Sequence, residues 1–503
     1  MSRIISGRST LPVLPLLLWD VPPGLELALA QEGVPHRRIE PTHPLAFRAG
    51  RFVLYDGQSV GRDRLRAMLT PEHAAIDVAR LVDDEETDPY RDLVDAEAAP
   101  ARWRVDGLDL IERVARKPKA AIRDRLLGRL RAEVDAAGGI WARLAPFPCP
   151  YRSAFNFRAD LDESSPDDYA RFARARRPID DCTTHFVSTR AYGQEPAVLA
   201  DLRGLDAQSH GHHHVAYRDP EANRRNLRRA HATLVDAGIE PVGFAAPHGR
   251  WNRGLDDAVA GLGYRYASDF HLGRDDLPFF PWLGDRFSNV LQVPIHPVCE
   301  GLFLDAGAGD DAGRMTANHL ARVVRAKVRA GEPAFVYGHP ERRLARFPEV
   351  LETLAGEVAD EPLLWRVTLT EFADWWRWRG ERSWTVVAKD GRYEAQFDDW
   401  DARFPLAIEI VRGKHSAMLP IRGPRVALRL EDLAYEARNP SSRADLPEPT
   451  AARGPIGWRS RVREALDWET VTPLDELPRR TLTDKVKKQL RTWQAAAAGE
   501  SDR

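Results

Sequence analysis

The sequence has few cysteines, no apolar run long enough to cross a bilayer and no excess of charge of either sign. Cys149, Cys182 and Cys299 are odd in number and far apart, which is typical of reduced thiols and excludes a disulfide framework. Lysine and arginine total 73 against 75 for aspartate and glutamate, so the charge balance predicts no nucleic-acid partner. The 503 residues predict two or three domains of an ordinary globular protein.

The apolar stretch at residues 11–18 is the one segment that resembles a targeting signal. It contains two prolines, and no small-residue cleavage site follows it. Because it is also too short to span a bilayer, we interpret it as a buried strand. The sequence therefore predicts a cytoplasmic protein without stable membrane insertion. No feature of the sequence indicates an oligomeric state.

Residues 150–380 contain apolar strand candidates that alternate with helical segments, which is the pattern of a parallel sheet or barrel. The seven candidate strands are 155–158, 184–188, 242–245, 264–268, 290–294, 334–337 and 364–369. Polar and histidine-rich segments follow several of them. Seven strands with such residues at their carboxyl ends predict an incomplete (β/α) barrel.

The rest of the chain divides into four further parts by composition. We expect a small α/β domain at 1–90, a helical linker region at 91–149, a small antiparallel β domain at 381–436, and a flexible connector with a basic helical tail at 437–503. Within the linker region, apolar spacings of three and four predict a helix from residue 108 to about 137.

The C-terminal tail is increasingly basic, with Lys485, Lys487, Lys488 and Arg491 on a helical pattern. Attraction to an anionic surface is one interpretation. A solvated surface helix with a frayed end is the other.

Two pairs of side chains in the central region have metal-ligand spacing. Asp160 and Asp162 follow a strand candidate, and residues i and i+2 of an extended chain point to the same side. His210 and His214 are one helical turn apart, so both rings can reach one ion. Turn capping by the aspartates and a chance histidine cluster are the structural alternatives. The occurrence of both pairs in one β/α region favours a site in which Asp162, His210 and His214 hold a divalent cation.

With these motifs, residues 150–375 resemble the polysaccharide deacetylase family, also described as the NodB-homology fold or carbohydrate esterase family 4. The resemblance implies a deformed (β/α)7 barrel that hydrolyses N- or O-acetyl groups, or related C–N bonds, with a divalent metal. It implies that Asp160 is the general base and that Asp162 binds the metal. The second motif matches at residues 210–214, where Gly211 replaces the usual hydroxyl residue and His212 and His213 are additional donors.

The third family motif normally carries an arginine that orients the catalytic aspartate, and Ala245 occupies its position here. Arg158 or Arg250 could supply the missing guanidinium. His339, in the segment Gly338-His339-Pro340, matches the motif whose histidine acts as general acid, and a strand-end histidine bonded to a carbonyl is the structural alternative. The resemblance further predicts a substrate pocket, formed by Pro247, His248, Arg250, Trp251 and His296.

These residues predict a metal-dependent hydrolase, with zinc as the expected ion. The resemblance implies that it removes acetyl groups from an acetylated carbohydrate. An amidohydrolase acting on a non-sugar C–N bond is a second hypothesis. A third is a non-catalytic protein that binds a metal or a carbohydrate after losing the family arginine.

Overall fold

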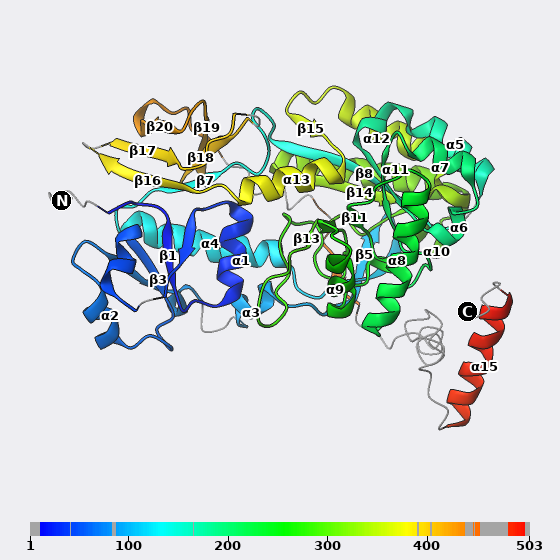
Figure 1. The fold of residues 1–503 in the computed structure, drawn as a ribbon. Helices are drawn as coiled ribbons and strands as arrows, with labels where there is room; N and C mark the ends of the chain where they lie inside the picture. Colours follow the sequence, from blue (N-terminus) through cyan, green and yellow to red (C-terminus); the bar gives the residue numbers. More distant parts are fainter. Residues whose placement is uncertain are drawn as a thin grey trace.

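The computed structural model places most of the chain in two groups of sheets that lie side by side along one long axis (Figure 1). The described residues are 11–40, 42–82, 87–163, 165–389, 392–402, 405–437, 446, 448–452 and 481–497. Within these ranges, every helix is too short or too polar to span a lipid bilayer.

The central sheet has eight strands, and all their pairings are parallel. Its order is β13-β12-β11-β10-β9-β8-β14, and β15 also pairs with the start of β8. The strands are β8 (Ser153–Leu161), β9 (Thr183–Val187), β10 (Asp206–Ser209), β11 (Gly243–Phe244), β12 (Tyr266–Ala267), β13 (Leu291–Gln292), β14 (Pro333–Gly338) and β15 (Leu364–Arg366). This curled sheet confirms the mixed α/β class and the deformed barrel that the sequence predicts.

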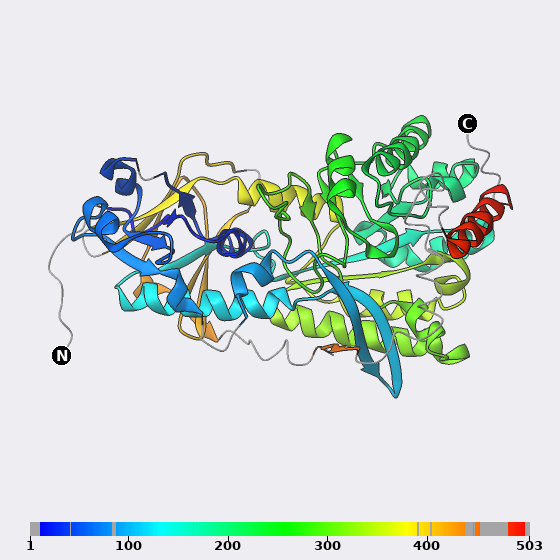
Figure 2. The same cartoon turned by 90° about the horizontal axis from the view of Figure 1, so that it is seen from below.

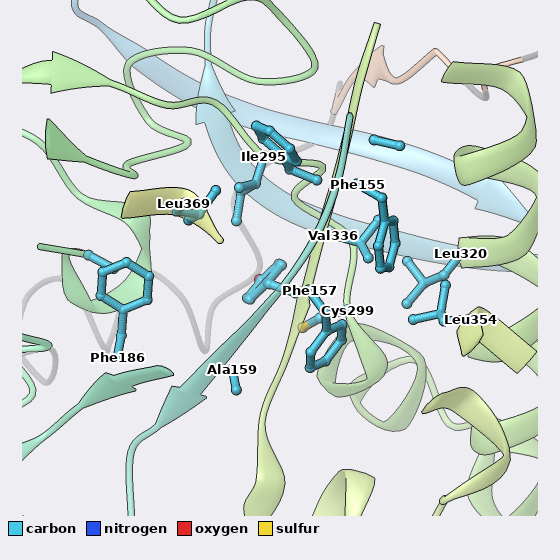
Figure 3. Packing of buried hydrophobic residues seen from close by; sticks show 14 of the residues in the cluster. Phe155, Phe157, Ala159, Phe186, Ile295, Cys299, Leu320, Val336, Leu354 and Leu369 are labelled. Carbon is cyan, nitrogen blue, oxygen red and sulfur yellow. The ribbon is translucent and has the colours of Figure 1, made fainter. Parts of the chain in front are cut away.

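Each of the seven predicted strands overlaps a strand of this sheet, and β10 is an additional one. The sequence did not reveal β10 because Asp206-Ala207-Gln208-Ser209 lacks an apolar run. All nine residues of β8 are buried, as expected for a central parallel strand that is covered on both faces. Figure 3 shows Phe155 of β8 beside Leu320 and Leu354, which belong to two covering helices.

Helices follow the strands and cover the sheet, as the alternating pattern predicts. The helices of this region are α5 (Pro166–Arg176), α6 (Thr189–Tyr192), α7 (Pro196–Leu202), α8 (Pro220–Asp236), α9 (Arg253–Gly261), α10 (Glu300–Asp305), α11 (Ala312–Ala330), α12 (Glu349–Ala359) and α13 (Leu369–Gly380). Asp219 caps α8, where its side chain accepts a hydrogen bond from the Ala222 amide. A capping box of Thr368 and Glu371 opens α13.

A second parallel sheet, in the order β2-β1-β3-β4, forms the N-terminal end of the molecule. It contains β1 (Leu16–Trp19), β2 (His36–Arg38), β3 (Phe52–Tyr55) and β4 (Ala74–Asp77), with helices α1 (Pro23–Glu32), α2 (Arg62–Met68) and α3 (Pro89–Leu93). The apolar stretch at residues 11–18 thus supplies most of a buried strand, as the sequence predicts.

The helix expected from residue 108 onward is wrong in its first part. Residues 108–115 form β6 (Leu108–Ala115), which pairs antiparallel with β5 (Ala98–Val105), and helix α4 spans Lys119–Ala136. Asp106 and Gly107, with φ of 48° and 86°, make the tight turn between them. Trp103 and Leu110 of this hairpin are buried in the barrel core, and that burial favours strands over local helical spacing.

Residues 381–436 form antiparallel strands, as the sequence predicts, but these strands belong to two sheets. One sheet has the order β16-β17-β20, and the other has the order β21-β19-β18-β7. The strands are β7 (Trp141–Leu144), β16 (Trp384–Lys389), β17 (Arg392–Phe397), β18 (Ala407–Arg412), β19 (His415–Pro420), β20 (Arg425–Leu428), β21 (Glu436–Ala437) and β22 (Thr450–Ala451), the last of which pairs with β5.

Strands β7, β16, β17, β18 and β20 and the N-terminal sheet bury apolar side chains in one cluster, which includes Leu16, Trp141 and Ile408 together with Leu126 of α4. The five-part division of the chain remains a prediction. The connector predicted from residue 437 onward falls mostly outside the described residues. Beyond it lies α15 (Leu482–Ala497), at the opposite end of the molecule from the N-terminal sheet (Figures 1 and 2).

Candidate metal centre and catalytic pocket

The candidate residues lie at the carboxyl ends of three parallel strands. Asp160 is the penultimate residue of β8, and Asp162 comes directly after that strand. His210 comes directly after β10, and His339 comes directly after β14. Because β8 lies between β9 and β14 in a parallel sheet, these ends meet at one edge. This is the edge where (β/α) barrels carry their functional side chains.

Asp162, His210 and His214 converge as the sequence predicts. Oδ1 of Asp162 lies 3.2 Å from Nε2 of His210 and 3.1 Å from Nε2 of His214. Ligands at about 2.0–2.1 Å from a shared zinc ion are separated by roughly 3.3 Å in tetrahedral geometry, so the three atoms are spaced as ligands of one ion.

The burial, the hydrogen bonding and the charge of these atoms also fit a bound cation. Oδ1 of Asp162 and Nε2 of His210 are buried, and neither has a hydrogen-bond partner of suitable geometry within the described part of the chain. Burial opposes ionisation of Asp162, but the neighbouring rings of His214 and His210 hold its pKa well below the usual range. An ionised carboxylate and two imidazoles form a donor set that suits a divalent transition metal such as zinc.

The backbone of Ala245 orients His210. The carbonyl oxygen of Ala245 lies 2.7 Å from Nδ1 of His210 and accepts a hydrogen bond from it. This contact leaves the lone pair of Nε2 directed at Asp162, as is usual for a metal-bound histidine. The position at which the family motif has an arginine thus contributes a main-chain contact here.

The segment that carries the two histidines is a loop, and the expected helical turn is wrong. Asn226 of α8 shapes this loop: its Oδ1 accepts from the amides of His212 and His213, and its Nδ2 donates to the His213 carbonyl. Gly211 has φ of 85°, and a Cβ there would lie 3.1 Å from Nδ2 of Asn226. Glycine therefore suits this position better than a hydroxyl residue.

The two additional histidines are placed differently from the ligand pair. Nδ1 of His212 lies 3.0 Å from Oγ1 of Thr189, and the rings of His212 and His213 pack against each other at 4.6 Å. Neither residue belongs to the group of three that converges at the metal centre.

Arg158 provides the guanidinium for Asp160. Its Nε and Nη2 each donate to one carboxylate oxygen at 2.6 Å, and its Nη1 donates to the main chain of Ser268. Arg158 is fully buried between the rings of Phe186 and Tyr337. Although burial opposes ionisation, Arg158 and His210 hold the pKa of Asp160 below its usual value, so the carboxylate is ionised.

His339 pairs with a residue that the sequence did not single out. Nδ1 of His339 donates to Oε1 of Glu300 at 2.6 Å, and Nε2 lies 3.7 Å from Oδ2 of Asp162. Burial alone would lower the pKa of His339, but the Glu300 and Asp162 carboxylates raise it well above its usual value. These carboxylates favour the protonated ring, and its Nε2 faces the candidate metal centre.

These groups line a cavity of about 460 Å³. The lining residues are Glu112, Asp160, Asp162, His210, His214, His248, Gly249, Phe270, Cys299, Gly301, Leu302, Asp305, Tyr337, His339 and Arg343. His248 is thus the one member of the predicted substrate pocket that lines it. Burial and the nearby His214 lower the pKa of His248 to about 3, so its ring is neutral.

The other four predicted pocket residues lie outside this lining. Pro247 is buried in the turn η4 (Pro247–Gly249), and Trp251 packs on the cluster of Leu27, Leu272 and Phe279. Arg250 lies close enough to Glu112 to lower the pKa of that carboxyl, although burial raises it to about 7. The buried ring of His296 contacts Asp275 and His319.

Sequence reasoning missed Glu112, Glu300, Cys299 and Arg343. Glu112 belongs to the β5–β6 hairpin, outside the region with barrel-like alternation. The turn at Asp106-Gly107 was the sequence signal that could have indicated this hairpin. Glu300 begins α10 and reaches a histidine 39 positions further along the chain, without a local pattern that reveals the contact.

Comparison with models of protein families and with curated protein sequences finds no match. Solved structures of proteins described as polysaccharide deacetylases are similar to part of the chain. One from Mycobacterium smegmatis has 19% identity and a TM-score of 0.40, covering 47% of this chain and 94% of that one. One from Pseudomonas aeruginosa PAO1 has 18% identity and a TM-score of 0.39, covering 46% and 94%.

A family 4 carbohydrate esterase pseudoenzyme from Bacillus anthracis is also similar, with 12% identity and a TM-score of 0.31 over 45% of this chain and 66% of that one. At identities this low the similarity concerns the fold of less than half of the chain, and it assigns no residue a role.

Proposed function

We propose that the protein is a metal-dependent hydrolase that removes acetyl groups from an N- or O-acetylated carbohydrate. The observation that carries the proposal is the convergence of Asp162, His210 and His214, with His339 and the Arg158-bound Asp160 lining the same cavity. Three potential ligands, an ionised carboxylate and a protonated imidazole are the groups that hydrolysis of an acyl bond requires.

Asp162, His210 and His214 would hold the metal, and zinc is the ion that this donor set fits best. A divalent ion bound there would lower the pKa of a water molecule and polarise the acyl carbonyl of the substrate. The three donors are held in place by the end of β8, the end of β10 and the loop that Asn226 shapes.

Asp160 acts as the general base in this proposal. Its carboxylate lines the cavity, and Arg158 fixes the orientation of both oxygens. An ionised, immobilised carboxylate can accept the proton of the attacking water. Arg158 is fully buried, so its contact with Asp160 is shielded from solvent.

His339 acts as the general acid. Glu300 binds Nδ1–H of the ring and stabilises its protonated form, which leaves Nε2–H to be donated to the departing amine or alkoxide. This arrangement favours the catalytic interpretation of His339 over a strand-end histidine that bonds only to a carbonyl.

The motif resemblance at residues 160–162, 210–214 and 338–340 is the basis for an acetylated carbohydrate as substrate. The cavity volume lies within the range of roughly 300–1,000 Å³ that is common for small-ligand sites. The hypothesis of a non-catalytic binding protein was based on the absence of the family arginine. Arg158 donates hydrogen bonds to Asp160, so that reason for the hypothesis no longer applies.

The test is release of acetate from N-acetylglucosamine oligomers and aryl acetates by metal-loaded protein, with Asp160→Asn as the matched variant. We expect turnover by the wild type and a loss of about a thousand-fold in the variant, with metal content unchanged. Cleavage of small amides or imides alone would favour the amidohydrolase hypothesis. Absence of turnover on every substrate, with metal bound, would favour the binding protein.

A further inference from the structure

Helix α15 carries a row of exposed apolar side chains that the proposed function does not use. Leu482 is 81% exposed, Val486 is 48% exposed and Trp493 is 62% exposed. Their spacing of four and seven residues places them on one face of the helix. In the described part of the chain, three of the six exposed large apolar side chains are therefore gathered on a single helix of 16 residues.

The rest of the helix is basic. Lys485, Lys487, Lys488 and Arg491 stand against a single acid, Asp484. Lys485 and Lys487 neighbour Val486 in sequence and so lie at the two borders of the apolar row. Arg491 lies on the opposite side and is 8% exposed, so the helix turns its polar side inward and its apolar row outward.

We propose that α15 docks the protein on an anionic lipid surface. The helix lies in the plane of the surface, with Leu482, Val486 and Trp493 among the headgroups and the first acyl carbons. Lys485 and Lys487 bind headgroup phosphates along both borders. Leucine and tryptophan on one face with lysines beside them is the composition of helices that lie in the interface between lipid and water.

Charge favours lipid over a second copy of the chain as the occupant. Two copies of α15 that met through their apolar rows would bring Lys485 and Lys487 of each helix together around a small apolar contact. An anionic lipid surface instead attracts each lysine near it. Helix α15 lies at one end of the molecule, apart from the sheets (Figure 1).

The test is co-sedimentation of the full chain with vesicles of phosphatidylcholine alone or mixed with phosphatidylglycerol. We expect binding to the mixed vesicles, weakened by salt, and little binding to phosphatidylcholine alone. Lys485→Gln and Lys487→Gln should each lower the partition coefficient about five-fold. Val486→Asp should lower it about ten-fold or more. Leu45→Asp, which changes a similarly exposed apolar residue (56%) at the other end of the molecule, is the matched control and should bind as the wild type does.

Quenching of tryptophan fluorescence by brominated lipid identifies the element that inserts. Quenching should be lost in Trp493→Leu while co-sedimentation is retained. Equal binding to both kinds of vesicle, unchanged binding of Val486→Asp, or no binding at all would overturn the proposal. Concentration-dependent dimerisation without lipid that Val486→Asp abolishes would overturn it in favour of a second copy. Acetate release in solution is independent of these results.

Discussion

Arg158 and Asp160, two residues apart on β8, form a fully buried ion pair in which both carboxylate oxygens are bound at 2.6 Å. Both side chains lie on the same side of the strand, and Arg158 reaches across to Ser268 near the end of β12. The guanidinium that the family motif takes from another strand is thus supplied by the same strand as the carboxylate it orients.

Replacing Arg158 with lysine should lower kcat about a hundred-fold while metal content stays the same. Lysine keeps the charge but contacts the carboxylate at one point, so Asp160 can rotate away from the attacking water. Steady-state kinetics and elemental analysis of Arg158→Lys measure the two quantities. Arg250→Gln is the control, because Arg250 does not line the cavity, and a comparable kcat loss there would contradict the assignment.

Removing the charge of Arg158 should destabilise the fold through Asp160. Arg158→Met leaves a buried carboxylate without its partner, which costs about 3–5 kcal/mol. The double variant Arg158→Met, Asp160→Asn should recover much of that stability without recovering activity. Denaturant unfolding of the two single variants and the double variant measures the coupling. Additive effects of the two substitutions would show that the pair is not an energetic unit.

His214→Ala should bind far less metal than the neighbouring variant His213→Ala. Of these two histidines, only His214 directs Nε2 at Asp162, whereas His213 packs against His212. We expect elemental analysis to find about one equivalent of zinc in His213→Ala and little in His214→Ala. Similar metal content in the two variants would mean that the ligand set within residues 210–214 is assigned incorrectly.

Asn226 should matter for metal affinity although it is not a ligand. Asn226→Ala releases the amides of His212 and His213, so the loop no longer holds His214 in position. We expect metal affinity to fall about ten- to a hundred-fold, as measured by competition with a chelator. Asn226→Asp keeps the acceptor for both amides and should lose less. Equal losses in both variants would argue against the acceptor role.

The sequence predicted seven of the eight strands of the barrel because apolar residues are closely spaced in them, as Phe155 and Phe157 are in the buried strand β8. It also predicted the convergence of Asp162, His210 and His214, since the carboxyl ends of parallel strands meet at one edge. It could not distinguish Arg158 from Arg250 as the partner of Asp160. That choice depends on which side chain is enclosed by Phe186 and Tyr337, and no spacing in the chain encodes it.

The hairpin of β5 and β6 shows a different limit. Apolar residues at 110, 111 and 114 fit a helix as well as a strand, so local periodicity could not decide between them. The decision comes from Trp103 and Leu110, which bury their side chains in a core formed by residues far away in the sequence. Glu112 reaches the cavity only because the hairpin forms, and its place in the site was therefore hidden as well.

Lys119, the first residue of α4, is a buried lysine whose charged form lowers the stability of the folded protein. Its Nζ donates to the carbonyl of Leu272 at 2.8 Å and lies 5.0 Å from the centre of the Phe279 ring. Burial lowers the pKa of Lys119 to about 8, although Asp276 opposes the shift. Folding therefore disfavours the protonated form relative to the unfolded chain, in which the pKa is about 10.4.

The stability of the wild type relative to Lys119→Met should therefore rise with pH. Above the pKa of Lys119 in the unfolded chain, the lysine is neutral in both states and does not change stability with pH. As pH falls from about 10.4 to 8, the unfolded chain takes up a proton that the folded chain does not. The free energy of unfolding therefore decreases over this range. Between pH 7 and pH 10 the wild type should gain about 2–3 kcal/mol on the variant, at 1.36 kcal/mol per pKa unit. Urea unfolding of both proteins at the two pH values measures this difference. Parallel pH trends would mean that Lys119 remains charged in the folded protein, with Asp276 offsetting its burial.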